Sequence, residues 1–411
     1  MTAGTSNVRV WWICALLLCA STINYMDRRT LRNSSEEIKA EFHLDDVEVG
    51  GQKQGNKYYG RLEFAFGWAF AVGATVFGVI VDRTNIRWLY PAVLVAWSTM
   101  GFLTGYVETY AGLLACRLFL GLFEAGHWPC ALKTTQRLLP PEKRTLGNSV
   151  LQSGTAIGAI ITPLILKFYL TDDVGSWRPA FRVIGMIGFG WAIFWWFTIR
   201  PNELLPEPPA ADQNAKGEGF LRVVFSRQFL TLLLVVNLIN ISYHFFRVWL
   251  NGYLQNDRGF TRTERLDFMF WFYIYHDVGC LAAGALTVWL CRGNWSAGFA
   301  RGVVFTGCAL LVAMSVFLPV LPAGWPFFIV MMIISMGLLG LFPCYYAFAQ
   351  DLSRRHQGKV SGMLGTIAWL VLSPMQELFG MLIDSTKRYD VGLAAVGLLP
   401  LVAVVCLAIM G

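Results

Sequence analysis

Two charged side chains interrupt an apolar segment at residues 110–137, within the run RLFLGLFEAGHWP. At ~1.5 Å per residue of helix, Arg117 lies about 10 Å and Glu124 about 21 Å from Tyr110. Their seven-residue separation is close to two helical turns, so both face the same way. Buried charges cost free energy in hydrocarbon, so we interpret this pair as functional, with a purely structural salt bridge as the alternative. Gly121, between them, is expected to leave space for a ligand or a partner charge.

A second group of charges ends the first apolar segment, in the sequence NYMDRRTLR. Asp27 and Arg28 are adjacent and therefore point in different directions around a helix. We expect Arg29 and Arg32 to extend toward the membrane surface. Asp27 and Arg28 are the nearest charged pair in this half of the chain, so we predict that they are the partners of the pair in segment 110–137.

The second half of the chain has its own charges inside apolar segments, Arg247 in YHFFRVWL and Asp277 in YHDVG. His244 lies three residues from Arg247, and we favour a polar helix contact over a proton relay for it. The same interpretation applies to His127, beside Trp128.

The sequence LQSGTAIG supplies polar side chains that can form hydrogen bonds with the hydroxyl groups of a ligand. Gln152 and Thr155 are the candidates for such contacts. The alternative is a helix interface of small residues, for which Gly154 and Gly158 have the small-xxx-small spacing. The sequence leaves both interpretations open.

These side chains need long apolar helices to position them. Apolar residues make up 55% of the 411 residues and charged residues only 14%, against about 25% charged in a soluble domain. Segments of about 20 apolar residues, enough to cross a membrane, recur along the chain. The sequence predicts an all-α membrane protein with twelve spans, at 9–31, 58–81, 88–107, 110–137, 145–169, 179–199, 228–254, 267–291, 297–320, 324–349, 359–383 and 391–410.

The span pattern divides into two halves. A polar stretch rich in Pro, Gly and charge separates spans six and seven, so we predict halves 1–200 and 223–411 joined by a linker at 201–222. GHWPC (126–130) and GLFPC (340–344) indicate that the halves are repeats. Lys and Arg concentrate in alternate loops, which predicts cytoplasmic termini and linker; the basic loop 258–265 disagrees.

Several function classes are disfavoured. The net charge of +7 comes from basic residues that punctuate apolar segments, so we expect no nucleic-acid partner. The nine cysteines have no metal-binding spacing, and we interpret them as packing residues. The sequence contains no phosphate-binding loop, metalloprotease motif or nucleophile elbow. We therefore expect no enzymatic activity, no metal and no cofactor.

The loop GVIVDRTNIR (78–87) carries a more specific signal. Gly78, Asp82 and Arg83 resemble the G-x3-D-R motif between spans two and three of the major facilitator superfamily, although Thr84 stands where a glycine is usual. NYMDR and R-x3-G-x2-E-A-G resemble motifs of its anion:cation symporter group, which includes hexuronate and galactonate transporters. YHDVG resembles that group's A-D-x-G, with His276 in place of the alanine.

The resemblance implies a major facilitator fold of two pseudo-symmetric six-helix halves, working as a proton-coupled symporter of a small organic anion such as a hexuronate or an aldonate. Asp27 and Glu124 would carry the coupling proton, Arg28 and Arg117 would engage the substrate carboxylate or nearby acids, and Tyr25 and Tyr59 would line the cavity. The candidate substrate contacts Gln152, Thr155 and Arg247 complete this set, and Gly78, Asp82 and Arg83 would gate it.

Rival interpretations remain. A protein with the same fold could be an uncoupled uniporter or an anion exchanger, or a membrane sensor that does not transport. In each case the expected surroundings are the lipid bilayer of a bacterial inner membrane, and the expected state is a monomer.

Overall fold

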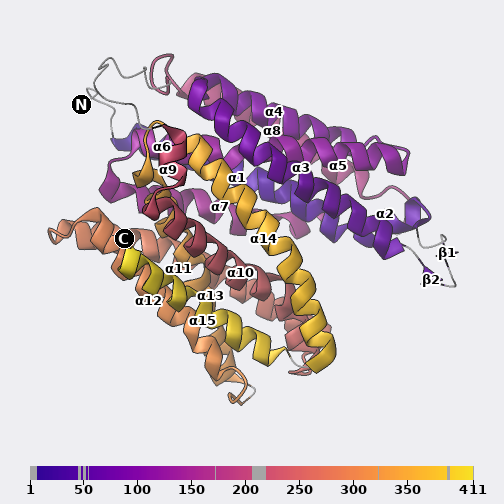
Figure 1. The fold of residues 1–411 in the computed structure, drawn as a ribbon. Coiled ribbons are helices and arrows are strands. Elements are labelled where there is room, and N and C mark those ends of the chain that lie inside the picture. Colours follow the sequence, from indigo (N-terminus) through magenta and orange to yellow (C-terminus); the bar gives the residue numbers. More distant parts are fainter. Residues whose placement is uncertain are drawn as a thin grey trace. The chain divides into compact units, whose positions relative to one another are not determined.

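The computed structural model describes residues 7–44, 48–49, 52–53, 55–171, 173–205, 219–322, 324–386 and 389–410. Helices make up nearly all of this part of the chain (Figure 1). The first eight are α1 (Asn7–Asn33), α2 (Ser35–Glu41), α3 (Gly55–Arg83), α4 (Ile86–Thr104), α5 (Tyr110–Glu124), α6 (His127–Leu138), α7 (Pro141–Tyr169) and α8 (Arg178–Thr198). Between α2 and α3, strands β1 (Glu48–Val49) and β2 (Gln52–Lys53) pair antiparallel, with Glu48 opposite Lys53.

The remaining elements follow the polar stretch after α8. They are α9 (Phe220–Val224), α10 (Arg227–Asn256), α11 (Arg262–Arg292), α12 (Ala297–Ala313), the 3-10 turn η2 (Met314–Phe317), α13 (Trp325–Leu352), α14 (Gln357–Thr386) and α15 (Asp390–Met410). Each of the twelve predicted spans therefore lies on helix.

The length and composition of these helices fit a membrane protein. Within the described residues, nine helices are long and apolar enough to cross a bilayer. Helices satisfy their own backbone hydrogen bonds, which lipid cannot do. The other three predicted spans correspond to α4, to α5 with α6, and to α14. The prediction of an all-α membrane protein is confirmed.

The fourth predicted span is not one continuous helix. It is interrupted at Ala125 and Gly126, between α5 and α6. Pro129 has no backbone N–H to donate to the carbonyl of Ala125, so the helical ladder loses one hydrogen bond at this point. At the same place the helix tightens, because the amide of Gly126 donates to the carbonyl of Phe123, three residues earlier and not four, at 3.1 Å. The predicted span 110–137 therefore consists of two helices, α5 and α6, that meet at this interruption.

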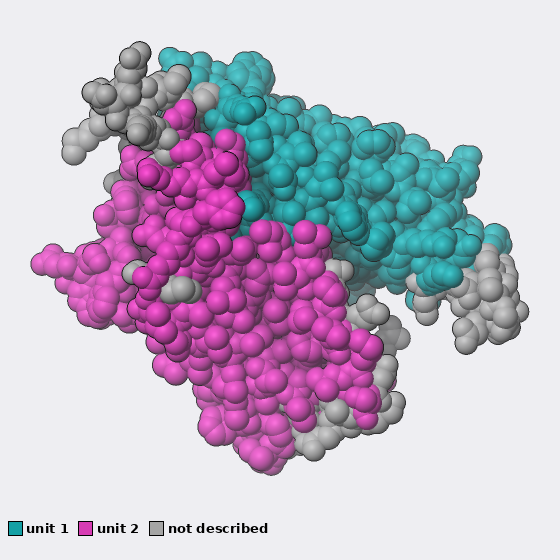
Figure 2. All heavy atoms as spheres, in the orientation of Figure 1, with its two compact units in different colours: residues 1–134, 154–207, 361–366 teal, residues 135–153, 208–360, 367–411 magenta. Residues whose placement is uncertain are grey.

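The chain forms two compact units (Figure 2). Unit 1 contains residues 1–134, 154–207 and 361–366, and unit 2 contains 135–153, 208–360 and 367–411. The division falls within α6, α7 and α14. The boundaries of the two halves expected from the sequence, and its linker 201–222, remain a prediction; most of that linker lies outside the described residues.

Helices α3 and α5 cross closely in unit 1. The hydroxyl of Tyr110 donates to the carbonyl of Tyr58 at 2.8 Å, and farther along both helices Gly121 faces the backbone of Phe66. Contacts advance in the same direction along both sequences, so α3 and α5 run parallel. A Cβ at position 121 would overlap the carbonyl oxygen of Phe66. Gly121 therefore permits close helix packing, and the expectation that it leaves space for a ligand was wrong.

Other close helix contacts in unit 1 follow the same principle. Helices α4 and α8 lie side by side (Figure 1). Gly154 and Gly158 of α7 face the backbone of α1, where a Cβ at position 158 would lie 2.6 Å from the carbonyl oxygen of Thr22. Small residues let membrane helices approach closely, so the small-residue interface foreseen for these two glycines is present.

Unit 2 has a large apolar core built from α10, α11, α12, α13 and α15. Phe245 and Phe246 of α10 and Phe305 of α12 are fully or almost fully buried within it. Gly279 of α11 faces the backbone of Met336 in α13, which allows these two helices to pack tightly.

Candidate functional site

An ion pair between α1 and α5 occupies the interior of unit 1. Nε of Arg28 donates to Oε2 of Glu124 at 2.7 Å. Glu124 is fully buried and Arg28 is 9% exposed. Removing two charges from water is costly unless they are paired with good geometry, and this pair meets that condition. The predicted partnership between the first and fourth spans is thus present in the structure.

Asp27 lies beside this pair without a counter-charge bonded to it. Its side chain is 1% exposed, and neither carboxylate oxygen has a hydrogen-bond partner among the described residues. Gly101 of α4 makes room for it, since a Cβ there would lie 2.9 Å from Oδ1 of Asp27. A buried carboxyl group in this position is suited to taking up a proton, which removes its charge.

Arg117 completes the cluster through an aromatic ring. The ring of Phe66 has the guanidinium carbon of Arg28 at 4.9 Å and that of Arg117 at 4.8 Å from its centre, both within the range of cation–π attraction. Arg117 is 1% exposed, and its Nε and Nη1 have no hydrogen-bond partner in the part of the chain that the structure describes. These N–H groups are suited to donate hydrogen bonds to a carboxylate.

The two predicted cavity tyrosines occupy different surroundings. Tyr25 lies one turn from Arg28, whose guanidinium carbon is 5.7 Å from its ring centre. Tyr59 packs against an apolar cluster that includes Leu31 and Trp177, and its hydroxyl lies 3.5 Å from the carbonyl of Leu31. Tyr25 is therefore part of the charged cluster, whereas Tyr59 lies near the ends of α1 and α3.

Sequence reasoning missed Glu63. This acid of α3 pairs with Arg32 of α1 at 3.2 Å, with side chains 29% and 41% exposed. Arg32 was expected to extend toward the membrane surface, and its pairing with an acid was not foreseen. Glu63 lies six residues inside the predicted second span 58–81, counted from its first residue. Its depth was the available signal.

The residues of the G-x3-D-R motif are held by two neighbours. Lys133 of α6 donates to Oδ1 of Asp82 at 2.5 Å, and both side chains are buried. The Cα of Gly78 lies 3.1 Å from the point that a Cβ on Gly362 of α14 would occupy. Arg83, the last residue of α3, is exposed. The role of Lys133 as the partner of Asp82 was not predicted.

The other predicted substrate contacts are distributed between the units. Thr155, in unit 1, is buried. In unit 2, Gln152 is also buried and accepts a hydrogen bond from the hydroxyl of Tyr346 at 3.0 Å. Arg247 of α10 is half-buried, and one turn away the ring of His244 lies 5.9 Å from that of Trp369.

His276 and His127, the other two histidines named in the sequence analysis, make polar contacts within the helix packing. Nδ1 of His276 lies 2.8 Å from the carbonyl of Ser335, and the His276 ring stacks between Tyr243 and Phe272. Nδ1 of His127 lies 2.8 Å from the hydroxyl of Tyr90. These geometries agree with the helix-contact interpretation given above for His127.

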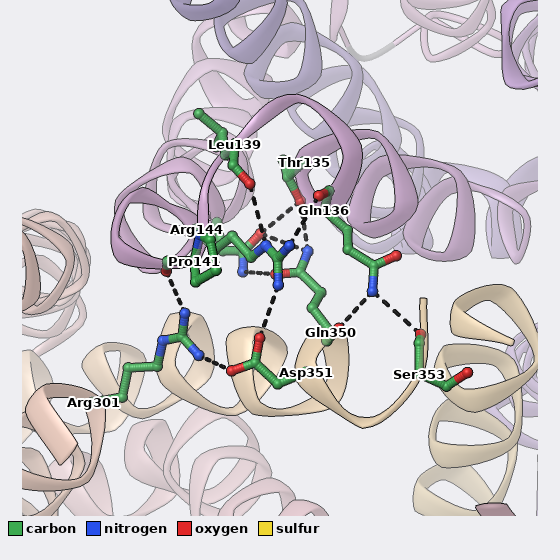
Figure 3. Close-up of polar contacts among 10 residues, drawn as sticks. Thr135, Gln136, Leu139, Pro141, Arg144, Arg301, Gln350, Asp351 and Ser353 are labelled. Atoms are coloured by element: carbon green, nitrogen blue, oxygen red, sulfur yellow. Dashed lines mark hydrogen bonds and ion pairs between the residues drawn. The ribbon is translucent and has the colours of Figure 1, made fainter. Parts of the chain in front are cut away.

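A second charged cluster in unit 2 was not predicted as a site. Figure 3 shows Asp351 of α13 between Arg144 of α7 and Arg301 of α12. Arg144 donates to Asp351 at 2.8 Å, and Arg301 forms an ion pair with the other carboxylate oxygen. Both arginines are buried whereas the Asp351 side chain is 41% exposed. The three residues lie at helix ends that the loop charges predict to be cytoplasmic.

Buried amides extend this cluster. Gln350 donates to Thr135 at 2.7 Å and accepts from Asn148 at 3.0 Å. Gln136 donates to the carbonyls of Gln350 at 2.5 Å and Ser353 at 3.2 Å. The network joins the polar ends of α6, α7 and α13 (Figure 3). Its hydrogen bonds stabilise the packing of these three helix ends against one another.

Comparison with known proteins agrees with this architecture. The profile of the Major Facilitator Superfamily matches residues 17–375. The chain is 25% identical over 391 residues to a hexuronate transporter of Bacillus subtilis, covering 92% of this chain and 89% of that protein. It is 24% identical over 335 residues to a D-galactonate transporter of Escherichia coli, covering 76% and 75%.

A solved structure supports the fold independently. The proton:xylose symporter XylE, bound to 6-bromo-6-deoxy-D-glucose, superposes with a TM-score of 0.76 at 10% sequence identity, over 98% of this chain and 95% of that one. At this identity the likeness concerns the fold alone. The curated relatives are transporters and not enzymes. With a family match over most of its length, the chain belongs to the Major Facilitator Superfamily.

Proposed function

We propose that this protein is a proton-coupled symporter of a small organic anion, with a sugar acid such as a hexuronate or an aldonate as the substrate class. The observation that carries the proposal is the buried cluster of Asp27, Arg28, Arg117 and Glu124 in unit 1. Within the described part of the chain, it combines guanidinium N–H groups that lack a hydrogen-bond partner with two buried carboxyl groups. The named substrates of the two curated relatives, hexuronate and D-galactonate, are carboxylates of this class.

Coupling follows from competition for the arginines. A guanidinium presents a planar fork that binds a carboxylate through two hydrogen bonds. If the substrate takes Arg28 away from Glu124, the buried acid loses its counter-charge and a proton must replace it. Substrate binding and proton binding then favour each other, because linkage is reciprocal.

Alternating access needs contacts that stabilise one conformation of the transporter and break when it converts to the other. We assign this role to the motif residues Gly78, Asp82 and Arg83, with Lys133 as the partner of Asp82. Access would alternate by movement of the two six-helix halves, as in other transporters built from repeats. We further propose a monomer in a bacterial inner membrane with both termini cytoplasmic.

The test is uptake of radiolabelled glucuronate and galactonate into proteoliposomes, with and without an inward proton gradient. We expect the gradient to drive accumulation by the wild type. In Glu124→Gln this accumulation should be lost, because a neutral amide cannot carry the proton. Exchange of internal for external anion should persist in the variant, which separates coupling from binding.

The other outcomes have defined meanings. Equal uptake with and without the gradient would point to a uniporter or an anion exchanger. Absence of transport for both anions, with binding retained, would favour a sensor. Glu203→Gln is the matched control, because Glu203 pairs with Arg9 at 2.7 Å outside the cluster, and it should accumulate anion like the wild type.

A further inference from the structure

Glu63 belongs to a stripe of side chains along one face of α3. Tyr59, Glu63, Phe66 and Phe70 follow a spacing of four, three and four residues, which places them on one helix face. This face packs against α1, because the guanidinium of Arg28 lies over the rings of Phe66 and Phe70 at 4.9 and 4.7 Å. Glu63 therefore faces the charged cluster and not lipid.

Glu63 and Arg117 lie at the same level of unit 1. Helices α3 and α5 run parallel and meet where Gly121 packs on the backbone of Phe66. Glu63 is three residues before Phe66, and Arg117 is four residues before Gly121, so each lies about one turn from this crossing on the same side.

Glu63 has charged and polar neighbours. Arg32 of α1 pairs with it at 3.2 Å, and Tyr59 lies one turn away on the same face of α3. Glu36 of α2 is 78% exposed and pairs with Lys39 at 2.8 Å. The Arg32 pair is partly exposed, and solvent weakens such pairs. Arg32 therefore compensates the negative charge of Glu63 only in part, and the remaining charge can attract Arg117.

We propose that Glu63 is a positioning residue that holds Arg117 when no substrate is bound and competes with the substrate carboxylate for it. Arg32 weakens this competition, because its positive charge partly compensates the negative charge of Glu63. The role rests on the proposed function, in which the anion binds at Arg117. It makes Glu63 a determinant of affinity that prevents the anion from being trapped on the buried arginine.

The test measures equilibrium dissociation constants of glucuronate and galactonate for the purified full-length protein by calorimetry. Glu63→Gln should tighten binding by about three- to tenfold, because one opposing charge at the level of Arg117 is removed. Arg32→Gln should weaken binding by a similar factor, because Glu63 then acts fully on Arg117. The double variant should bind as tightly as Glu63→Gln, because Arg32 acts on Arg117 only through Glu63.

Controls separate this role from structural damage. Glu63→Asp keeps the charge and should bind like the wild type. Glu36→Gln removes an acid that is 78% exposed and paired with Lys39, and it should leave binding unchanged. Damage to the fold would instead weaken binding in both Glu63→Gln and Arg32→Gln, with lower unfolding temperatures.

The failures of the two proposals are distinguishable. Wild-type binding of either anion, with unchanged or weaker binding by Glu63→Gln, would overturn the role of Glu63 and leave the proposed function standing. Lack of binding of both anions by the wild type would overturn the sugar-acid assignment and the role of Glu63 with it.

Discussion

Arg28 and Arg117 share one aromatic ring, and each has guanidinium atoms without a hydrogen-bond partner among the described residues. Two like charges on a common ring repel each other, so carboxylates must compensate them. Glu124 does this for Arg28 directly. An incoming carboxylate can therefore accept hydrogen bonds from Nε and Nη1 of Arg117 without first breaking an existing hydrogen bond of these two atoms.

The guanidinium shape of Arg117 is expected to matter as much as its charge. In Arg117→Lys the ammonium keeps the charge but cannot form two parallel hydrogen bonds with a carboxylate. We expect at least about tenfold weaker anion affinity from the loss of one charge-assisted hydrogen bond. Initial uptake rates over a range of substrate concentrations measure the change.

The control for Arg117→Lys is Arg178→Lys. Arg178 pairs with Glu41 at 2.6 Å away from the cluster, so its replacement should leave substrate affinity unaltered. Wild-type affinity in Arg117→Lys would remove Arg117 from the substrate site.

At the scale of elements, close helix crossings position the charged side chains. Arg117 reaches the ring of Phe66 because Gly121, one turn later on α5, lets α3 approach to backbone contact. Helix association in lipid depends on such packing, since apolar burial provides little driving force there. The crossing of α3 and α5 is therefore both a structural contact and the support of the site.

Gly121→Ala should separate α3 from α5. The added methyl group would overlap the carbonyl oxygen of Phe66, and overpacking of this kind costs about 1–3 kcal/mol. We expect a lower unfolding temperature in detergent and weaker anion binding, because Arg117 moves relative to Phe66. Thermal unfolding followed by tryptophan fluorescence measures the first effect.

Gly190→Ala provides the comparison for Gly121→Ala. Gly190 lies in α8, where a Cβ would meet no atom within 4 Å, and alanine favours helix by about 1 kcal/mol over glycine. Its unfolding temperature should stay equal or rise. If both variants behaved alike, the crossing would not be the cause.

At the scale of the molecule, the network around Asp351 connects α7, α12 and α13 within unit 2 (Figure 3). One carboxylate serves two buried arginines, so the cluster depends on a single residue. If transport requires rearrangement of these helix ends, this network must open in each cycle. Its stability then sets how long the protein stays in the present arrangement.

Asp351→Asn should destabilise this arrangement. It leaves Arg144 and Arg301 buried without their carboxylate. Removal of one partner from a fully buried pair costs about 3–5 kcal/mol, and the 41% exposure of Asp351 lowers this cost. We expect faster labelling of a single cysteine placed at Ser353, which is 6% exposed in the present arrangement. With the nine native cysteines replaced in every protein, the measurement compares the labelling rate at position 353 with and without Asp351→Asn.

Asp267→Asn is the control for the network variant. It also neutralises an aspartate of unit 2, but one that is exposed near the start of α11. Its labelling rate at position 353 should match the wild type. Equal rates in all three proteins would show that Asp351 does not hold the network closed.

The sequence by itself determined the helices and the central pair of charges. Long apolar runs must form helices in lipid because no other structure satisfies their backbone there. Arg117 and Glu124 stood out because charges in the middle of such runs are rare and costly. Arg28, the partner of Glu124, could be named because few other charges were available to pair with this acid.

Tertiary structure alone decided the contacts made near helix ends. Lys133 and Asp351 lie near helix ends, where charges are ordinary in membrane helices, so position along the chain did not distinguish them. The depth of Glu63 marked it as unusual but did not identify its partner. Which arginine or lysine pairs with each depends on which helices become neighbours and at what level they cross. The same holds for Gly121. From the sequence, a glycine between two charges predicts open space, and only the structure shows that the backbone of α3 fills it.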